Sequence, residues 1–287
     1  EVQKYDISKI KGTIIECNTA YPGMRNTAEE HLKVAEEHGF TSFADVDIMD
    51  GDGEFISENF HCRVIPGTII IIPKEKIVLI PNGLDNDIHL NQEEKQNIRL
   101  KLGLAPSDLI ILYVGRMVEA KGLKELLEAF EILFNQNSKV RLVIVGEVFN
   151  LNQFVKYTPN SSTHITYTGL IGKERLNEWY EISDIGILPS YTEQCSYTAI
   201  EMMLHKLPII TTSGNGLKDM FTDRENAIVL SPDKSTLTDS IVSAIIYVMR
   251  CRKSEIHTMV ENAYKRATTE YSIENMSRKY FNIICEQ

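Results

Sequence analysis

Long hydrophobic runs are absent from this sequence of 287 residues, although 43% of the residues are hydrophobic. No stretch approaches the roughly 18 apolar residues that a membrane-spanning helix needs. The first residues also lack the basic and apolar regions of a signal peptide. These absences predict a cytoplasmic protein without a membrane span, and they leave peripheral membrane association open. The chain starts with Glu1 instead of Met, which fits a processed chain or a fragment.

Cationic residues and cysteines are also few. Lys and Arg number 30 against 40 Asp and Glu, which gives a formal charge of −10, whereas a nucleic-acid surface needs clustered cations that displace counterions. We therefore expect no nucleic-acid partner. The five cysteines are scattered and form no C-x-x-C pair of the kind that zinc sites use. A reducing compartment fits this pattern, and no metal or other cofactor is expected.

Strand-like and helix-like patterns alternate from residue 109 onward. Apolar runs of the length of buried parallel strands cover residues 109–114, 140–145, 165–168, 185–188 and 208–212. Helical patterns cover residues 123–134, 173–180, 197–204, 235–249 and 254–268, and a last helix starts at about residue 273. This alternation indicates stacked βαβ units. The sequence therefore predicts an α/β fold with a Rossmann-like doubly wound parallel sheet.

The first 76 residues follow a different pattern. A strand is predicted at 12–16 and a helix at 27–38, and an acidic loop covers 45–53. Residues 68–72 are predicted to form a buried strand, with a linker or an exposed edge as the alternatives. We therefore expect a small, atypical N-terminal α/β segment before residue 77, followed by the doubly wound domain to residue 287.

A turn with two cations follows the first strand of the repeating pattern. Gly115 lets the backbone pass close to a ligand, and Arg116 and Lys121 place positive charge beyond the carboxyl end of the sheet. Open α/β folds bind ligands at that position, so the turn can hold an anion. The alternative is that both cations are ordinary solvated residues of the surface.

Two glutamates eight positions apart mark a second informative segment. Glu193 lies in a loop after a strand, and Glu201 lies two turns into the following helix. Free N–H groups of residues 195–198 at the start of this helix can face a diphosphate. Carboxylates accept hydrogen bonds from vicinal hydroxyls, so one glutamate can hold a ribose and the other a hexose. The alternative is an ordinary exposed helix surface.

An ordered series of short motifs surrounds these residues. It comprises Ile80-Pro-Asn-Gly-Leu-Asp85, Val114-Gly-Arg-Met117 with Lys121-Gly122, Val143-Ile-Val-Gly-Glu147, Thr168-Gly169, Asp184, Leu188-Pro-Ser190, the segment from Glu193 to Glu201, and Leu207-Pro-Ile-Ile-Thr211. The series resembles the C-terminal, donor-binding domain of family 4 of the GT-B glycosyltransferases, and it covers most of the chain.

The resemblance implies retaining transfer of a sugar from a nucleoside-diphosphate-sugar donor to a glycan or lipid-linked acceptor in surface polysaccharide biosynthesis. Arg116 and Lys121 would neutralise the diphosphate, Glu193 would contact the donor sugar, and Glu201 would bind the ribose. Further donor contacts would come from Gly115, Gly169, Ile171, Cys195, Ser196, Tyr197 and Thr198, with the base near residues 169–172. The leaving phosphate would help to deprotonate the acceptor on the front face, without a dedicated metal.

The sequence departs from the family pattern in two ways. The family commonly has Gly where this sequence has Ser196, which leaves the donor preference open. Only about 76 residues precede the matched segment, too few for a complete GT-B acceptor domain, and residues 11–65 are instead similar to a fragment of domain-of-unknown-function family 362. A fusion, a chimeric chain or a misjoined reading would each explain this pairing. The alternative function is therefore a nucleotide-sugar-binding module without turnover, and residues 1–76 can have chemistry of their own.

Other candidate groups have simpler explanations. His31 and His38 share one predicted helix face, which is expected to be solvated surface. His205 is expected to pack against the Glu201 helix or to cap it. Cys195 lies at a helix N-terminus, a position that can lower a thiol pKa, but no adjacent base accompanies it. Three acidic pairs have the D-x-D spacing of some cation sites, although acidic loops are usually only solvated: Asp45/Asp47, Asp50/Asp52 and Asp85/Asp87.

Overall fold

The computed structural model describes residues 54–56, 61–63, 79–85, 89–147 and 152–285. The chain divides into two units, Glu1–Leu79 and Ile80–Gln287. In the first unit, β1 (Glu54–Ile56) pairs with β2 (His61–Arg63) in antiparallel register. The other predictions for this unit, which are the strands at 12–16 and 68–72, the helix at 27–38 with its two histidines, and the acidic loop, lie outside the described residues.

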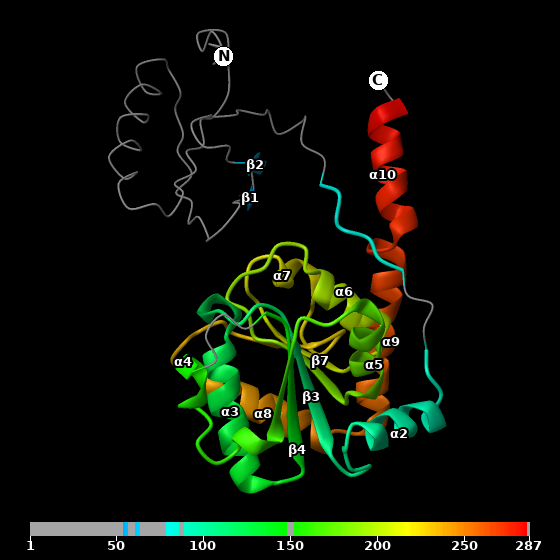
Figure 1. Cartoon of the computed structure of the whole chain (residues 1–287). Coiled ribbons are helices and arrows are strands. Elements are labelled where there is room, and N and C mark those ends of the chain that lie inside the picture. The colour runs from blue at the N-terminus through cyan, green and yellow to red at the C-terminus, as the bar shows by residue number, and fades with distance from the viewer. Residues whose placement is uncertain (1–53, 57–60, 64–78, 86–88, 148–151, 286–287) are drawn as a thin grey trace, which may run out of the picture. The chain divides into compact units, whose positions relative to one another are not determined.

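Six parallel strands form the sheet of the second unit (Figure 1). They are β3 (Leu109–Val114), β4 (Val140–Val145), β5 (Ile165–Gly169), β6 (Ile185–Leu188), β7 (Ile209–Thr212) and β8 (Ile228–Leu230). The order across the sheet is β5-β4-β3-β6-β7-β8, with parallel pairing throughout. The chain therefore builds outward from β3 on one side and from β6 on the other, and the strand order reverses between these two strands. The predicted fold class is confirmed.

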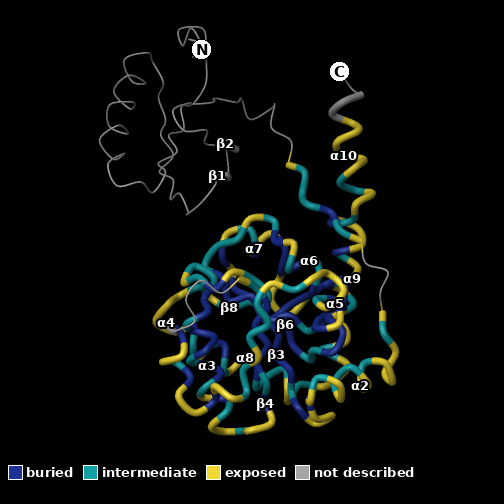
Figure 2. Tube along the Cα trace, viewed as in Figure 1, coloured by how far each residue is buried: buried dark blue, intermediate teal, exposed yellow. Residues whose placement is uncertain are grey.

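Helices cover both faces of this sheet. One face packs against α3 (Leu123–Gln136) and α8 (Leu237–Arg250), and the other against α5 (Lys173–Ile182), α6 (Tyr197–Leu204) and α9 (Lys253–Glu270). Successive side chains of a strand point to opposite faces. In β3, Ile111 and Tyr113 accordingly join the α3–α8 core, whereas Ile110 and Leu112 join the α5–α6–α9 core. Figure 2 shows the buried sheet between these helices.

The remaining helical elements lie at the periphery or in loops. They are α2 (Gln92–Lys101), η3 (Glu119–Lys121), α4 (Asn152–Val155), η4 (Ser162–His164), α7 (Leu217–Met220) and α10 (Ile273–Cys285). A capping box starts α2: Asn91 Oδ1 accepts from the Glu94 N–H at 3.0 Å, and Glu94 Oε2 accepts from the Asn91 N–H at 2.8 Å. Across the ranges that the structure describes, no helix is both long and apolar enough to cross a membrane.

Most elements of the second unit occur close to their predicted bounds. Strands β3, β4 and β6 and helix α6 have the predicted ends, and α3, α5 and α8 each end slightly later than predicted. Helices α2, α4 and α7, the short helices η3 and η4, and strand β8 were not predicted. Helix α2 buries none of its residues, so it has no apolar stripe to detect. Strand β8 has only three residues, which is too short for a periodic pattern.

Candidate functional site

Two loops meet where the strand order reverses. The first loop begins at Gly115 after β3 and leads to α3, and the second begins at Pro189 after β6 and leads to α6. Because β3 and β6 are parallel neighbours, their carboxyl ends lie at the same edge of the sheet. Open α/β sheets bind ligands in the crevice at such a reversal. The first loop contains Arg116 and Lys121, and the second contains Glu193.

Two glycines allow the loops at this edge to approach closely. Gly122 has a φ of +65°, and a Cβ built on it would lie 2.0 Å from the carbonyl oxygen of Pro189. Gly216 has a φ of +82°, and its Cβ would lie 2.3 Å from the carbonyl oxygen of Glu193. Only glycine adopts such φ values without strain and leaves room for a backbone at this distance. These contacts set the spacing of the loops.

Lys121 and Glu193 form an ion pair between the two loops. Lys121 Nζ lies 2.7 Å from Glu193 Oε1 and donates to the Thr192 carbonyl at 3.3 Å. Ser190 Oγ donates to the same Oε1 at 3.1 Å. Both charged side chains are less than one-fifth exposed, so solvent ions screen their attraction less than that of a surface pair. Within the described residues, Glu193 Oε2 has no hydrogen-bond partner.

Arg116 lies at the same edge without a partner for its charge. Its side chain is exposed, and its guanidinium makes no hydrogen bond or ion pair within the part of the chain that the structure describes. Its carbonyl accepts a hydrogen bond from the buried hydroxyl of Tyr113 at 2.7 Å. Burial raises the pKa of Tyr113, the negative charge of Glu193 raises it further, and Arg116 lowers it. Both charges therefore act on one buried hydroxyl.

Helix α6 begins at the end of the second loop with Ser196 as its N-cap. Ser196 is buried, has a φ of −71°, and accepts a hydrogen bond from the Ala199 N–H at 3.3 Å. This φ does not require glycine, and a serine cap stabilises the helix start. Residues Tyr197 and Thr198 lie too early in the helix for their N–H groups to have intrahelical acceptors. These N–H groups can therefore serve an anion.

Glu201 lies half-buried in α6 and contacts Tyr180 of α5. The Tyr180 hydroxyl donates to Glu201 Oε2 at 2.7 Å. Burial raises the pKa of Glu201, while the Tyr180 hydrogen bond and the positive charges of His205 and Lys173 oppose that rise. Sequence reasoning missed Tyr180, because one tyrosine in an amphipathic helix resembles any other core aromatic residue.

A buried polar network continues behind Tyr180. The Tyr180 ring stacks on His205, with the ring centroids 5.0 Å apart. His205 is the C-cap of α6, and its Nδ1 lies 2.7 Å from Glu181 Oε1. Glu181 Oε2 also accepts from the Leu90 N–H at 3.1 Å and pairs with Lys95 Nζ at 3.0 Å. Burial opposes ionisation of Glu181, but the hydrogen bonds from His205, Lys95 and Leu90 lower its pKa to about 2. His205 thus packs and caps, as expected.

Gly169 and Ile171 lie at the carboxyl end of β5, beside the end of β4. The Gly169 carbonyl accepts from the Gly146 N–H at 3.1 Å, and Gly169 has a φ of +67°. Ile171 packs partly buried against the core, whereas Leu170 between them is 76% exposed. The predicted donor-binding residues from the loops and from the start of α6 therefore lie at the carboxyl edge of the sheet, and Glu201 lies one turn further along α6. Direct contacts join Lys121 with Glu193, and Tyr180 with Glu201.

The helix start does not lower the thiol pKa of Cys195. Burial raises this pKa and outweighs an opposing hydrogen bond from the Asn82 backbone. The Asn82 side chain separately donates from Nδ2 to the Cys195 carbonyl at 2.9 Å. A thiol that stays protonated is a poor nucleophile. Of the D-x-D pairs, only Asp85 is described, and its carboxylate accepts from the Ile273 N–H at 3.3 Å. Among the described residues, no group of three His, Cys, Asp or Glu side chains can hold a metal ion.

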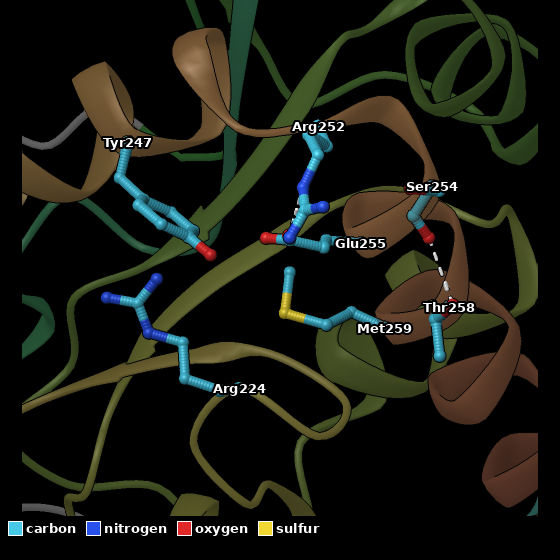
Figure 3. A pocket seen from close by; sticks show the side chains of 7 residues that line it. All are labelled: Arg224, Tyr247, Arg252, Ser254, Glu255, Thr258 and Met259. Carbon is cyan, nitrogen blue, oxygen red and sulfur yellow. Dashed lines mark hydrogen bonds and ion pairs between the residues drawn. The ribbon is translucent and has the colours of Figure 1, made fainter.

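A pocket of about 640 Å³ lies elsewhere in the unit (Figure 3). Its lining comes from the turn before β8, the end of α8 and the start of α9, so it lies near the amino ends of the strands: Arg224, Tyr247, Arg252, Ser254, Glu255, Thr258 and Met259. Both cations are engaged. Arg252 Nε donates to Glu255 Oε1 at 2.6 Å, and the Arg224 guanidinium lies 3.8 Å from the centre of the Tyr247 ring. The pocket contains no predicted site residue.

Residues 94–266 match the protein family described as glycosyl transferases group 1. An uncharacterised glycosyltransferase of Methanocaldococcus jannaschii is 26% identical over 243 residues, which cover 80% of this chain and 61% of that protein. The lipopolysaccharide 1,2-N-acetylglucosaminetransferase of Salmonella typhimurium is 24% identical over 219 residues, which cover 73% of this chain and 56% of that protein. The chain thus spans less than two thirds of the length of these relatives.

Solved structures share the fold. A glycosyltransferase from Rickettsia africae has a TM-score of 0.65 at 22% identity, covering 75% of this chain and 58% of that one. HepE from Anabaena, in complex with UDP and glucose, has a TM-score of 0.63 at 17% identity with the same coverage. The C-terminal domain of LpcC, a group 1 family protein from Francisella tularensis, has a TM-score of 0.54 at 21% identity, covering 68% of this chain and 97% of that domain.

Proposed function

Because the chain belongs to the group 1 glycosyl transferases, we propose that it binds a nucleoside-diphosphate-sugar at the carboxyl edge of its sheet and transfers the sugar to a glycan or lipid-linked acceptor. We further assign it to the retaining family 4 type, with surface polysaccharide as the end product. The Salmonella relative is named a lipopolysaccharide N-acetylglucosaminetransferase, and this name supports the acceptor class.

The observation that carries the proposal is the set of charges at the strand reversal. Arg116 presents an unengaged guanidinium, and Lys121 and Glu193 hold each other at 2.7 Å. A ligand with a diphosphate at one end and sugar hydroxyls at the other matches such a site, because the cations attract phosphate and the carboxylate accepts from hydroxyls. The N–H groups of Tyr197 and Thr198 add donors for the diphosphate.

In the proposed reaction, the cations act on the leaving group. Arg116 and Lys121 stabilise the negative charge that develops on the departing nucleoside diphosphate. Glu193 holds the sugar, Glu201 holds the ribose, and the segment from Gly169 through Ile171 receives the base. The leaving phosphate accepts the proton of the acceptor hydroxyl on the face from which it departs, so the reaction needs neither a protein base at the acceptor nor a dedicated metal.

We place the donor-binding domain at residues 77–287. The near-complete coverage of the LpcC C-terminal domain by this chain supports a self-contained donor domain. Residues 1–76 form a separate N-terminal part, and the similarity of residues 11–65 to domain-of-unknown-function family 362 stays a prediction. The cytoplasmic location also rests on the sequence alone.

Calorimetric titration with UDP, GDP and ADP, and then with the matching sugar donors, tests the donor site with and without Mg²⁺. We expect one nucleotide to bind selectively. Arg116→Ala and Glu201→Ala should each weaken its binding by about 10- to 100-fold, because each removes a charge-assisted hydrogen bond worth about 1–3 kcal/mol. Unchanged affinity in both folded variants would refute the assignment.

Matched controls make the same charge changes elsewhere. Arg250→Ala removes an exposed cation at the end of α8, and Glu178→Ala removes an exposed carboxylate of α5. Both controls should keep the nucleotide affinity of the unaltered chain. An equal loss in a control would show that net charge, and not the site, sets the affinity.

A second candidate function is a nucleotide-sugar-binding module without turnover. It is the alternative that the sequence analysis left open. The two functions differ in one measurement, the release of nucleoside diphosphate from the bound donor in the presence of glycan and lipid-linked acceptors. Sugar transfer to any acceptor eliminates the module, whereas tight donor binding without transfer supports it.

A further inference from the structure

Tyr180 lies against Glu201, a residue of the proposed donor site. It is fully buried, and its hydroxyl donates to Glu201 Oε2 at 2.7 Å. Glu201 lies one turn after the start of α6, where the N–H groups proposed to bind the diphosphate are found. One hydroxyl from α5 thus holds the proposed ribose-binding carboxylate.

We propose that Tyr180 is a positioning residue that orients the Glu201 carboxylate for the donor's ribose. This inference rests on the proposed function, because it assumes that Glu201 binds the nucleotide. Tyr180 itself is too deeply buried to touch the ligand, so its effect passes through Glu201.

The hydrogen bond does two things for Glu201. A carboxylate oxygen accepts in two directions, so Oε2 keeps one acceptor direction and Oε1 keeps both for the two ribose hydroxyls. The bond also holds the side chain in one rotamer before the ligand arrives, which reduces the conformational entropy lost on binding. In addition, a donor to the ionised form favours the carboxylate over the protonated acid in a half-buried position.

The network behind Tyr180 holds its ring in place. His205 stacks on the ring, Glu181 binds His205 at 2.7 Å, and Lys95 binds Glu181 at 3.0 Å. A buried polar chain of this kind has few alternative arrangements, because breaking any link leaves a buried polar group unpaired. Because His205 is the C-cap of α6, this stacking holds the Tyr180 hydroxyl in place relative to α6.

Tyr180→Phe tests the proposal, with Tyr271→Phe as its matched control. Tyr271 is a buried tyrosine of the same core, and within the described residues its hydroxyl makes no hydrogen bond. Affinity for the nucleotide that the unaltered chain binds is measured by calorimetry between pH 5 and 8. We expect about a 5- to 15-fold loss at pH 7 for Tyr180→Phe, from one hydrogen bond to a charged group, and no loss for Tyr271→Phe.

The pH profile adds a readout that simple loss of packing would not move. The ionisable groups that act on Glu201 are Tyr180, His205 and Lys173. Without the Tyr180 hydroxyl, Glu201 protonates at higher pH, so binding should fail at a higher pH in Tyr180→Phe. The Tyr271→Phe variant keeps the Tyr180 hydroxyl, so its profile should stay unshifted.

A double variant shows whether Tyr180 acts through Glu201. Adding Tyr180→Phe to Glu201→Ala should cost no further affinity, because the carboxylate to be oriented is gone. A further 5-fold loss, or a Tyr180→Phe protein that does not fold, would make Tyr180 a structural residue and overturn the proposal. If Glu201→Ala weakens binding and Tyr180→Phe does not, the positioning role fails while the proposed function stands. If Glu201→Ala has no effect, both fail.

Discussion

One arginine at each edge of the six-stranded sheet shows how the two edges differ. At the amino edge, Arg99 donates to the Ile182 carbonyl at 3.0 Å and to Asp184 Oδ2 at 2.9 Å, and Asp184 also accepts from the Ile110 N–H. At the carboxyl edge, Arg116 makes no such contact within the described residues. Arg99 and Asp184 join helix α2 to strand β3 and to the segment before β6. At the carboxyl edge Lys121 and Glu193 pair with each other, and the charge of Arg116 is available to a ligand.

The two edges also differ in how their segments are held together. At the amino edge, Arg99 and Asp184 satisfy each other and backbone groups, so a ligand would have to break existing bonds. At the carboxyl edge, close backbone contacts at Gly122 and Gly216 and the Lys121–Glu193 ion pair join the loops, and the Arg116 guanidinium takes no part in this contact. We therefore expect Arg99 to affect stability and Arg116 to affect nucleotide binding.

The largest expected effect is that of Gly122→Ala. A Cβ would lie 2.0 Å from the Pro189 carbonyl oxygen at a φ of +65°, so both strain and a backbone clash arise. We expect the free energy of unfolding to fall by about 3 kcal/mol or more, together with loss of nucleotide binding. Chemical denaturation measures the first effect and calorimetry the second.

Gly103→Ala is the control for Gly122→Ala. Gly103 has a φ of +71°, but nothing lies within 4 Å of a Cβ built there. It isolates the cost of the positive φ, about 1 kcal/mol. Equal losses in the two variants would show that the contact between the loops contributes nothing.

Acid should remove the contribution of Glu181. The folded pKa is about 2, below the ordinary carboxyl value of about 4.5, so the unfolded chain binds this proton at higher pH than the folded one. The stabilisation is present above about pH 4.5 and is lost as pH falls toward 2, and it amounts to on the order of 3 kcal/mol. The stability difference between the unaltered chain and Glu181→Gln, measured from pH 7 to 2, should shrink in that window. A constant difference would contradict it.

Arg99→Ala should lower stability, whereas Arg116→Ala should lower nucleotide affinity. Arg99→Ala leaves Asp184 without its cation and should lower the free energy of unfolding by about 2 kcal/mol, with unchanged nucleotide affinity. Arg116→Ala should change stability by less than about 0.5 kcal/mol, while affinity falls by about 10-fold or more. Thermal unfolding and calorimetry on both variants decide this. Loss of affinity in Arg99→Ala would erase the distinction between the edges.

The smallest effect concerns the N-cap of α6. Ser196→Ala removes the hydrogen bond to the Ala199 N–H and should cost about 1 kcal/mol, whereas Ser196→Gly should cost only a few tenths. Denaturant midpoints resolve the two. If nucleotide affinity rises in Ser196→Gly, a closer approach of the backbone to the donor is the reason, and the serine is then a determinant of donor preference.

Periodicity was sufficient for most of the fold. The buried strands β3, β4 and β6 are continuous apolar runs, and α6 has an apolar pattern and a serine cap, so their ends were predictable from local sequence. Helix α2 was not, because it buries none of its residues. The order of the strands could not be predicted from periodicity either, because the pairing of β3 with β6 joins segments more than 70 residues apart.

The candidate site was predictable in part for the same reason. Arg116, Lys121 and Glu193 follow strand ends, and parallel strands bring those ends to one edge. The pKa of the Cys195 thiol was not predictable, because it depends on burial by distant segments and not on its place at a helix start. Tyr180 also carried no signal, because its partner Glu201 is 21 positions away on another helix.

The sequence by itself determined the parallel α/β architecture, the chemical types at the strand ends and the absence of cationic clusters. Only the tertiary structure decided which charges are paired. Lys121 pairs with Glu193 and Arg99 pairs with Asp184, whereas Arg116 has no ion-pair partner within the described residues. The physical reason is the distance along the sequence over which each effect acts. Helix and strand periodicity act over a few residues, whereas hydrogen bonds, ion pairs and burial depend on which segments the packed core brings together.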